Sequence, residues 1–369
     1  MGVVATTLCL LACGAATARV EPRIRVLLYD DQASVRVGPA AAPVEIALSA
    51  TGGRLVVAGE ETPVWISDGS GPWRVGPRIV RGDILVRARE GRIQVLNQVG
   101  LEDYVASTVG GEMSASWPSA ALRAQAVAAR TYVMHHAGRR RGEAWDVRAT
   151  TVSQVYRGID TETSETRSAA RATAGEVLTY RGEPILAAFH STAGGRTATA
   201  GEVWGEDLPY LRVVDVEDED DAPHTYWRAV FEPLDLKEIL ESADVKVGAL
   251  RSIAVDQRTQ SGRVERLVIH GSERTETLSG RRLRTMMGGM GLRSTLFEIR
   301  ESPEGYVFVG SGYGHGVGMS QWGARAMAEK GASYKRILSR FYPGARLEQI
   351  PTRRFAGRGP ERSNEGDER

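Results

Sequence analysis

At its centre the chain reads Gly110-Gly111-Glu112-Met113-Ser114-Ala115-Ser116-Trp117-Pro118, and an alanine-rich run over residues 119–137 follows directly. Ser116 is a favourable N-cap residue, and Pro118 suits the first turn of a helix. Apolar residues recur at helical spacing along the run, and Gly138 is a suitable end. The sequence therefore predicts a long helix over residues 119–137, whose many alanines let neighbouring backbone approach closely.

The carboxylate of Glu112 stands just ahead of that helix. A shorter helix is predicted over residues 101–109, and Gly110-Gly111 is expected to end it, which leaves Glu112 on a glycine turn. Such a turn can bring the backbone close to a bulky substrate, and apolar neighbours such as Met113 or Trp117 can raise the pKa of a carboxyl group. The alternative is a carboxylate at a helix start that interacts with the helix dipole. The residues alone leave both interpretations open.

The segments on either side of this centre differ in pattern. Residues 23–99 contain short β-type runs broken by Gly, Pro and Asp, which predicts an N-terminal antiparallel β region. Helical and strand patterns mix from residue 100 to residue 347, so we expect an α+β fold with a mixed α/β core at 100–347. An acidic run at residues 217–221 lacks the glycine and ligand alternation of a calcium loop and is expected to be a solvated linker. The polar segment 352–369 is expected to be disordered.

Composition describes an ordinary globular chain of 369 residues, with 42% hydrophobic and 25% charged residues. Lys+Arg 47 and Asp+Glu 46 leave a net charge of +1, so no overall field attracts nucleic acid, and we expect no nucleic-acid partner. The glycines at positions 312, 314, 316 and 318 alternate and do not form a G-x-G-x-x-G loop. That spacing disfavours a phosphate-binding loop, and no cofactor is expected.

Both cysteines, Cys9 and Cys13, lie in an apolar run over residues 3–16 that is too short to span a bilayer. Two export signals fit this run. Leu10-Leu11-Ala12-Cys13-Gly14 resembles a bacterial lipobox with Cys13 as the lipidated residue, and Ala16-Thr17-Ala18 resembles an A-x-A cleavage site. A buried first strand or helix is the alternative. We expect residues 1–18 to be a signal peptide or lipoprotein signal, and the protein to be exported to the cell envelope, either free or lipid-anchored through Cys13.

Four blocks of sequence carry a family resemblance. They are Gly111-Glu112-Met113 through Trp117-Pro118 to Ala124-Gln125-Ala126-Val127-Ala128-Ala129-Arg130-Thr131-Tyr132; Ser153-Gln154-Val155-Tyr156-Arg157-Gly158; Phe189-His190-Ser191-Thr192-Ala193-Gly194-Gly195-Arg196-Thr197 leading to Val203-Trp204-Gly205 and Pro209-Tyr210-Leu211; and Gly312-Tyr313-Gly314-His315-Gly316-Val317-Gly318-Met319-Ser320-Gln321-Trp322-Gly323-Ala324. In order and spacing they resemble the SpoIID/LytB family of cell-wall proteins. The best-studied members of that family are lytic transglycosylases, which cut the glycan strands of peptidoglycan.

The resemblance implies that Glu112 is the catalytic acid. Most glycosidases need two carboxylates, but a lytic transglycosylase needs only one. The carboxyl first protonates the departing glycosidic oxygen and then takes the proton of the sugar's own 6-hydroxyl, which attacks the anomeric carbon. A 1,6-anhydro end forms without water. The implied partner is a peptidoglycan glycan strand, bound in a groove of the mixed α/β core.

Other polar residues of the blocks are candidates for glycan contact. A histidine in a glycine-rich turn can hydrogen bond to sugar hydroxyls, although a lone histidine is more often packed, and hydroxyl and amide side chains offer similar donors and acceptors. Aromatic rings fit either sugar stacking or core packing, and arginines on the long helix fit either peptidoglycan carboxylates or salt bridges. The expected glycan-binding residues are Gln154, Tyr156, His190, Ser191, Thr192, His315, Ser320 and Gln321; the aromatic and arginine candidates are Trp117, Trp204, Trp322, Arg123 and Arg130.

One departure from the family concerns metal. Some members hold a structural zinc with cysteine and histidine near the second block, where this chain has Arg148, Val152 and Ser153. These side chains cannot supply thiolate or imidazole ligands, so no metal is expected. Two further hypotheses concern function: a non-catalytic wall-binding protein that enhances a cell-wall amidase, and a structural protein of an envelope complex.

Overall fold

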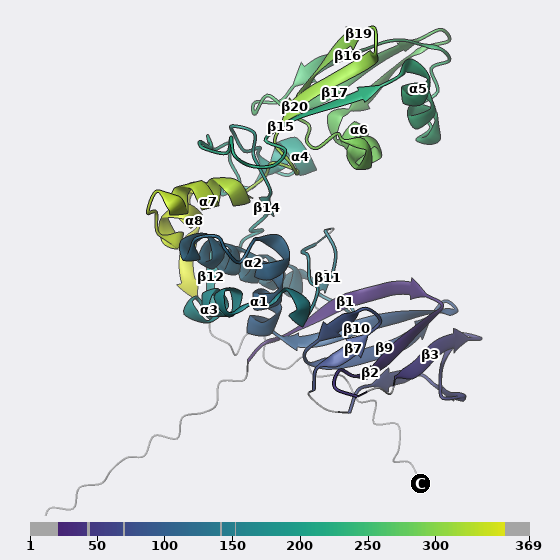
Figure 1. The fold of residues 1–369 in the computed structure, drawn as a ribbon, viewed down its shortest axis with the longest axis vertical. Coiled ribbons are helices and arrows are strands. Elements are labelled where there is room, and N and C mark those ends of the chain that lie inside the picture. Colours follow the sequence, from purple (N-terminus) through teal and green to yellow (C-terminus); the bar gives the residue numbers. More distant parts are fainter. Residues whose placement is uncertain (1–20, 43–44, 69–70, 141, 152, 351–369) are drawn as a thin grey trace, which may run out of the picture.

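The computed structural model describes residues 21–42, 45–68, 71–140, 142–151 and 153–350 (Figure 1). The expected signal at 1–18, the lipidation of Cys13 and the tail at 352–369 lie outside these residues. Helices combine with several antiparallel sheets, so the predicted α+β class is confirmed. No helix in the described part of the chain is both long and apolar enough to cross a membrane.

The N-terminal region is built from two sheets that share one hydrophobic core. The strand order is β11-β1-β10-β9-β6 in one sheet and β5-β4-β3-β2-β7-β8 in the other. All of these neighbours pair antiparallel except β11, which runs parallel to β1. The bounds are β1 (Arg23–Gln32), β2 (Ser34–Pro39), β3 (Ile46–Thr51), β4 (Arg54–Val57), β5 (Glu60–Thr62), β6 (Val64–Ile66), β7 (Trp73–Val75), β8 (Arg78–Val80), β9 (Asp83–Arg89), β10 (Arg92–Gly100) and β11 (Val147–Arg148).

The predicted long helix is α2 (Ser119–Arg139), and it forms the middle of what we call the central body, residues 101–216 and 317–350. All its alanines except the partly buried Ala120 are buried. The helix contacts helices α1, α3, α7 and α8 and strand β12, because small side chains permit such close approach. The predicted N-cap is wrong: Pro118 precedes the helix and makes no side-chain cap. The other elements of the body are α1 (Leu101–Glu112), the 3-10 helix η1 (Ile159–Thr161), α3 (Ser164–Ala172), β12 (Glu176–Tyr180), β13 (Glu183–Pro184), β14 (Phe189–His190), α4 (Ala200–Trp204), β21 (Met319–Ser320), α7 (Gln321–Glu329), α8 (Tyr334–Phe341) and β22 (Arg346–Gln349).

The glycine turn expected at Gly110-Gly111 is wrong, because α1 continues through both glycines to Glu112. Glycine is required there for space. A Cβ on Gly110 would lie 1.8 Å from the carbonyl oxygen of Thr161, and one on Gly111 would lie 2.6 Å from that of Val155. The segment 155–161 therefore packs directly against the end of α1, and Glu112 is the last residue of a helix.

A second unit, residues 226–311, lies within the range 100–347 and has its own hydrophobic core (Figure 1). Two antiparallel sheets, β15-β20-β19 and β16-β17-β18, carry this core together with two helices. The chain enters the unit after α4 and returns to the central body at β21. The bounds are β15 (Tyr226–Phe231), α5 (Pro233–Ser242), β16 (Leu250–Arg258), β17 (Val264–Gly271), β18 (Thr275–Ser279), α6 (Gly280–Met287), the 3-10 helix η2 (Gly288–Met290), β19 (Phe297–Ser302) and β20 (Gly305–Ser311).

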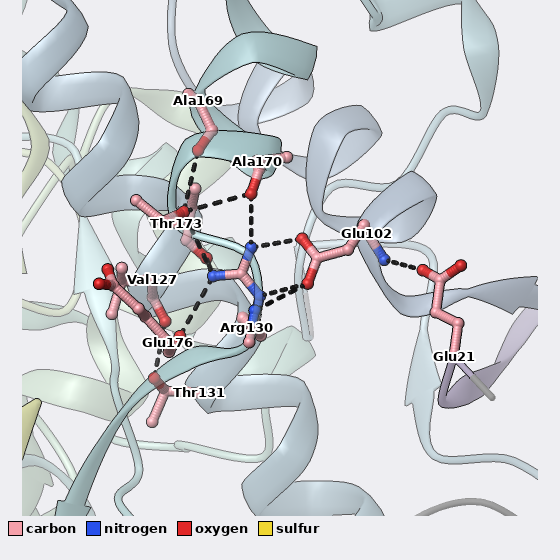
Figure 2. A network of polar contacts seen from close by, with 11 residues as sticks. Glu21, Glu102, Val127, Arg130, Thr131, Ala169, Ala170, Thr173 and Glu176 are labelled. Atoms are coloured by element: carbon pink, nitrogen blue, oxygen red, sulfur yellow. Dashed lines mark hydrogen bonds and ion pairs between the residues drawn. The ribbon is translucent and has the colours of Figure 1, made fainter. Parts of the chain in front are cut away.

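A buried arginine ties the helices of the central body together (Figure 2). The side chain of Arg130 on α2 is fully buried and binds both carboxylate oxygens of Glu102 on α1, at 2.9 and 2.5 Å. It also donates to the carbonyl oxygens of Ala170 on α3, at 3.1 Å, and Glu176 on β12, at 3.2 Å. Of the two interpretations for Arg130, the salt bridge is the one that the structure shows.

Candidate active site

Glu112 is half-buried at the end of α1, facing the second sequence block and the start of α7. The backbone N–H of Val155 donates to its Oε1 at 2.7 Å, and the Nε2 of Gln321 donates to its Oε2 at 3.4 Å. Among the described residues, no lysine, arginine or histidine forms an ion pair with this carboxylate. The acid is therefore held by neutral donors.

The surroundings of Glu112 disfavour its charged form. Burial raises the pKa of the Glu112 carboxyl above its ordinary value, against the opposing effects of the hydrogen bonds from Val155 and Gln321 and of the charge on Arg157. Its place at the C-terminal end of α1 acts in the same direction as burial, because the negative end of a helix dipole disfavours an anion. The alternative of a helix-start carboxylate is therefore wrong. A carboxyl with a raised pKa and no fixed cation can both give and accept a proton.

Two tryptophans stand next to this acid. Trp117, in the loop after α1, packs edge-on against Trp322, the residue after Gln321, with ring centroids 4.9 Å apart. The guanidinium of Arg325 lies over both rings, at 5.6 and 4.7 Å. An open pocket of about 720 Å³ begins beside Trp117; Glu112 itself does not line it. Its lining includes four serine hydroxyls and an indole, groups that bind sugars. The lining residues are Ala115, Ser116, Trp117, Ser119, Leu122, Ser164, Glu165 and Ser168.

The third and fourth blocks meet beside Glu112. Strand β14 pairs parallel with β21, with His190 opposite Ser320, and the N–H of Trp322 donates to the carbonyl of Ser191 at 3.1 Å. Gln321 is thereby fixed against Glu112, and the half-buried Ser191 lies in the adjoining chain. Of these two expected glycan contacts, Gln321 is only 6% exposed and serves as a donor to Glu112, whereas Ser191 is half-buried and more accessible.

Ser320 has a structural role, which corrects the expectation of glycan contact. Its side chain is fully buried, caps α7 by accepting from the N–H of Gly323, and donates to the carboxylate of Glu219, with the carbonyl oxygen of Ser191 3.2 Å away. Glu219 itself accepts from the backbone N–H groups of Ala193 and Gly194, each at 3.0 Å. The prediction of a solvated linker at 217–221 is therefore wrong for Glu219. Its carboxylate connects the third sequence block to the fourth through these hydrogen bonds.

His190 and Thr192 also point into the interior, with 5% and 1% exposure, so the expectation that they contact glycan is corrected as well. Nδ1 of His190 lies 3.1 Å from the carbonyl of Val317, and its ring is 5.6 Å from that of His315. Burial lowers the pKa of His190 well below its ordinary value and that of His315 to about 4, so both rings are neutral near pH 7. His315 lies beside Trp204, with ring centroids 5.3 Å apart, and away from the contacts of Glu112.

Gln154 and Tyr156 belong to the core, and the expected glycan contact is wrong for both, since each is 1% exposed. The hydroxyl of Tyr104 donates to Oε1 of Gln154 at 2.6 Å, and the hydroxyl of Tyr156 donates to Oδ1 of Asn97 at 2.7 Å. Their alternation with Val155 explains the arrangement, because neighbouring residues of an extended chain point to opposite sides. The two side chains anchor the segment whose backbone N–H holds Glu112.

The segment where some family members bind zinc is held by other contacts here. Arg148 pairs with Asp30 at 3.1 Å and lies over the ring of Trp145 at 4.8 Å, and the hydroxyl of Ser153 accepts from the N–H of Arg148. Val152 is outside the described residues. In the part of the chain that the structure covers, no three His, Cys, Asp or Glu side chains are grouped so that they could hold a metal ion.

The fold and this site describe an α+β protein with one half-buried carboxyl suited to acid–base chemistry. Residues 89–180, which include Glu112 and α2, match the family model described as Stage II sporulation protein (SpoIID). Residues 213–318, which include the second unit, match a model described as Domain of unknown function (DUF8618).

Curated relatives agree with the first match. The chain is 30% identical to stage II sporulation protein D of Bacillus subtilis, over 69% of this chain and 76% of that protein. It is 34% identical to an uncharacterized protein of Brachyspira hyodysenteriae, over 68% of this chain and 67% of that protein. It is also 34% identical to the amidase enhancer of Bacillus subtilis, of which it spans only 39%. The chain belongs to the stage II sporulation protein D family.

Proposed function

We propose that this protein is a peptidoglycan lytic transglycosylase in which Glu112 acts first as acid and then as base. Family membership supports the coarser statement of a cell-wall-related role. The transglycosylase activity itself is inferred from the environment of Glu112. This carboxyl is half-buried, has a raised pKa, and is held by a backbone N–H and an amide with no cation.

The reaction needs one proton donor that can recover its proton. Protonated Glu112 gives its proton to the glycosidic oxygen as the bond from that oxygen to the anomeric carbon breaks. The sugar's 6-hydroxyl oxygen then bonds to the anomeric carbon, and its proton returns to Glu112. Val155 and Gln321 keep the carboxylate in place between the two transfers, since both remain donors to it. No water is consumed.

The groove beside Trp117 supports a polymeric sugar substrate. Its serine hydroxyls and indole suit sugar rings, and the half-buried Ser191 offers a further polar group next to the chain that carries Gln321. A glycan strand in this groove would contact Trp117, and the partner ring of Trp117, Trp322, follows the Gln321 that donates to Glu112.

Digestion of purified peptidoglycan, followed by mass spectrometry of the fragments, tests this proposal. We expect 1,6-anhydro ends with the wild-type protein and a loss of about 10²–10⁴-fold in Glu112→Gln, which keeps the shape but removes the titrating proton. Glu304→Gln, an exposed carboxylate of the second unit, is the matched control and should cleave normally. Undiminished cleavage by Glu112→Gln rejects the assignment.

A second candidate function is stimulation of an amidase without cleavage. The similarity to the amidase enhancer of Bacillus subtilis favours it, although this chain spans 39% of that protein. The two functions differ in one assay: a non-catalytic enhancer raises the release of peptides by an added cell-wall amidase and forms no anhydro ends. A glycan-cleaving protein forms those ends with no amidase present.

Export to the cell envelope is part of the same proposal, because a wall enzyme must meet its substrate outside the cytoplasmic membrane. Residues 1–18 contain the two candidate export signals, the lipobox with Cys13 and the A-x-A cleavage site. Mass spectrometry of the N-terminus of protein purified from cell envelopes distinguishes a lipid on Cys13 from cleavage after Ala18. An unprocessed chain in the cytoplasm would contradict export.

A further inference from the structure

A second cavity, of about 310 Å³, is lined by residues of α4 in the central body and of α6 in the second unit. Figure 1 shows α4 on the side of the central body that faces this unit. None of the cavity's lining residues is among the contacts of Glu112. Its wall holds two carboxylates, three guanidiniums and two aromatic rings: Glu202, Glu265, Arg263, Arg281, Arg284, Trp204 and His315. Arg281 is exposed and donates to the carbonyl of Val203 at 3.1 Å.

Arg284 gives the cavity a positive charge that the described residues do not neutralise. It is half-buried, and its Nε donates to the carbonyl of Arg293 at 3.1 Å. No carboxylate in the described part of the chain forms an ion pair with it, and burial lowers the pKa of its guanidinium. A partly desolvated cation without a counter-charge is unfavourable, and an anionic group of a ligand would offset that cost.

Arg263 adds a second guanidinium to the same wall. It is 2% exposed, and its terminal nitrogens donate to the carbonyls of Arg196 and Ala193, at 3.1 and 2.9 Å. Its Nε is buried and has no hydrogen-bond partner among the described residues. The nearby carboxylate of Glu202 is engaged with the N–H and hydroxyl of Ser261, at 3.0 and 2.6 Å. Glu202 is therefore not free to bind Arg284.

The rest of the cavity offers an aromatic surface and one free anion. Trp204 is 39% exposed, and its ring adjoins the neutral ring of His315. Glu265 is exposed and forms no ion pair within the described residues. One cavity thus presents an unpaired cation, an unpaired carboxylate and an aromatic face, which together match a ligand with both charges and a short apolar part.

We propose that this cavity binds the zwitterionic end of a short peptide, with its carboxylate on Arg284, its ammonium toward Glu265 and its carbon chain against Trp204 and His315. The peptides attached to glycan strands have such ends, so the inference rests on the proposed wall function for the source of the ligand. A phosphate group is the competing ligand, because Arg263, Arg281 and Arg284 would attract it while Glu202 and Glu265 would repel its second charge.

Isothermal titration calorimetry on the full chain tests the site with the free tripeptide alanyl-glutamyl-diaminopimelate. The assay needs no cleavage, so failure of the transglycosylase proposal and failure of this one are distinguishable. We expect saturable binding by the wild-type protein, weakened about tenfold or more by Arg284→Gln, since a charge-assisted hydrogen bond is lost. Arg300→Gln, an exposed arginine of the same unit, is the control and should bind normally.

Three outcomes overturn the proposal: no saturable binding, equal binding by Arg284→Gln, or inorganic phosphate binding as tightly as the tripeptide. Should Arg284→Gln fail to fold, Glu265→Gln replaces it, because Glu265 is at the surface and its removal leaves the core intact. That variant is expected to bind the tripeptide severalfold more weakly, and unchanged binding would equally reject the assignment.

Discussion

The central body and the second unit are stabilised by different kinds of contact. The helices of the central body pack through alanines, and Arg130 and Gln154 bind them through buried polar contacts. The hydroxyl of Tyr156 binds the second sequence block to Asn97 on β10. The second unit has a core of larger side chains. There the ring centroid of Phe308 lies 5.5 Å from that of Phe231 and 5.6 Å from that of Phe297. Directional bonds fix positions more narrowly than apolar contacts do. Glu112, the candidate acid, belongs to the central body, whose atoms are positioned by such directional bonds.

The substitution Arg130→Met should cause the largest difference in stability between the central body and the second unit. Removing this guanidinium leaves the carboxylate of Glu102 and the carbonyls around it without their donor, so we expect a loss of about 3–5 kcal/mol in the free energy of unfolding of the central body. Urea denaturation measures it. Arg300→Met, an exposed arginine of the second unit, is the control, and a loss no larger than in that control would contradict the structural role.

The converse change is Leu240→Ala in α5, which opens a cavity in the core of the second unit, where Leu240 is fully buried. We expect a loss of about 2–4 kcal/mol, confined to residues 226–311, because the two cores are separate. Hydrogen exchange followed by mass spectrometry locates the effect. Equal loss of protection in α2 would show that the two parts unfold as one.

The smallest effect is expected from Gln321→Leu, next to the acid. Gln321 lowers the pKa of Glu112 by donating to its Oε2, so the substitution raises that pKa further. Because the acid step needs the protonated form, the alkaline limb of the pH–activity profile should move to higher pH, with a maximal rate reduced only severalfold. Initial rates of anhydro-end formation across pH measure this, with the exposed Gln257→Leu as control. An unmoved limb would mean that Gln321 does not tune the acid.

Local patterns allowed the elements to be predicted, and distant contacts explain the errors. The periodicity of the alanine run is enough to predict α2, since it depends on neighbours in sequence. The role of Gly110 depends on Thr161, which is distant in sequence, so the local pattern predicts a turn at Gly110 where the structure has a helix. Glu219 could not be told from its acidic neighbours, because its burial follows from contacts with Ala193 and Ser320.

In the candidate site, too, residues with a local sequence signal were predictable, and residues whose role depends on distant partners were not. Glu112 stands out in the sequence, and its partner Gln321 was among the expected glycan contacts. Gln154 and Tyr156 were not distinguishable from binding residues, because their partners Tyr104 and Asn97 come from a helix and a strand earlier in the chain. A polar side chain in a motif serves the core as readily as the ligand, and only its partners decide which.

The account depends most on the carboxyl group of Glu112 holding a proton beyond the usual pH range of a glutamate. A titration of ¹³C-labelled glutamate side chains by NMR measures this directly, with the Glu112 signal assigned by its absence in Glu112→Gln. We predict a midpoint above the ordinary value of 4.5, since burial outweighs the two hydrogen bonds and Arg157. A midpoint at or below 4.5 would make Glu112 a permanent anion near neutral pH and contradict its part as the acid.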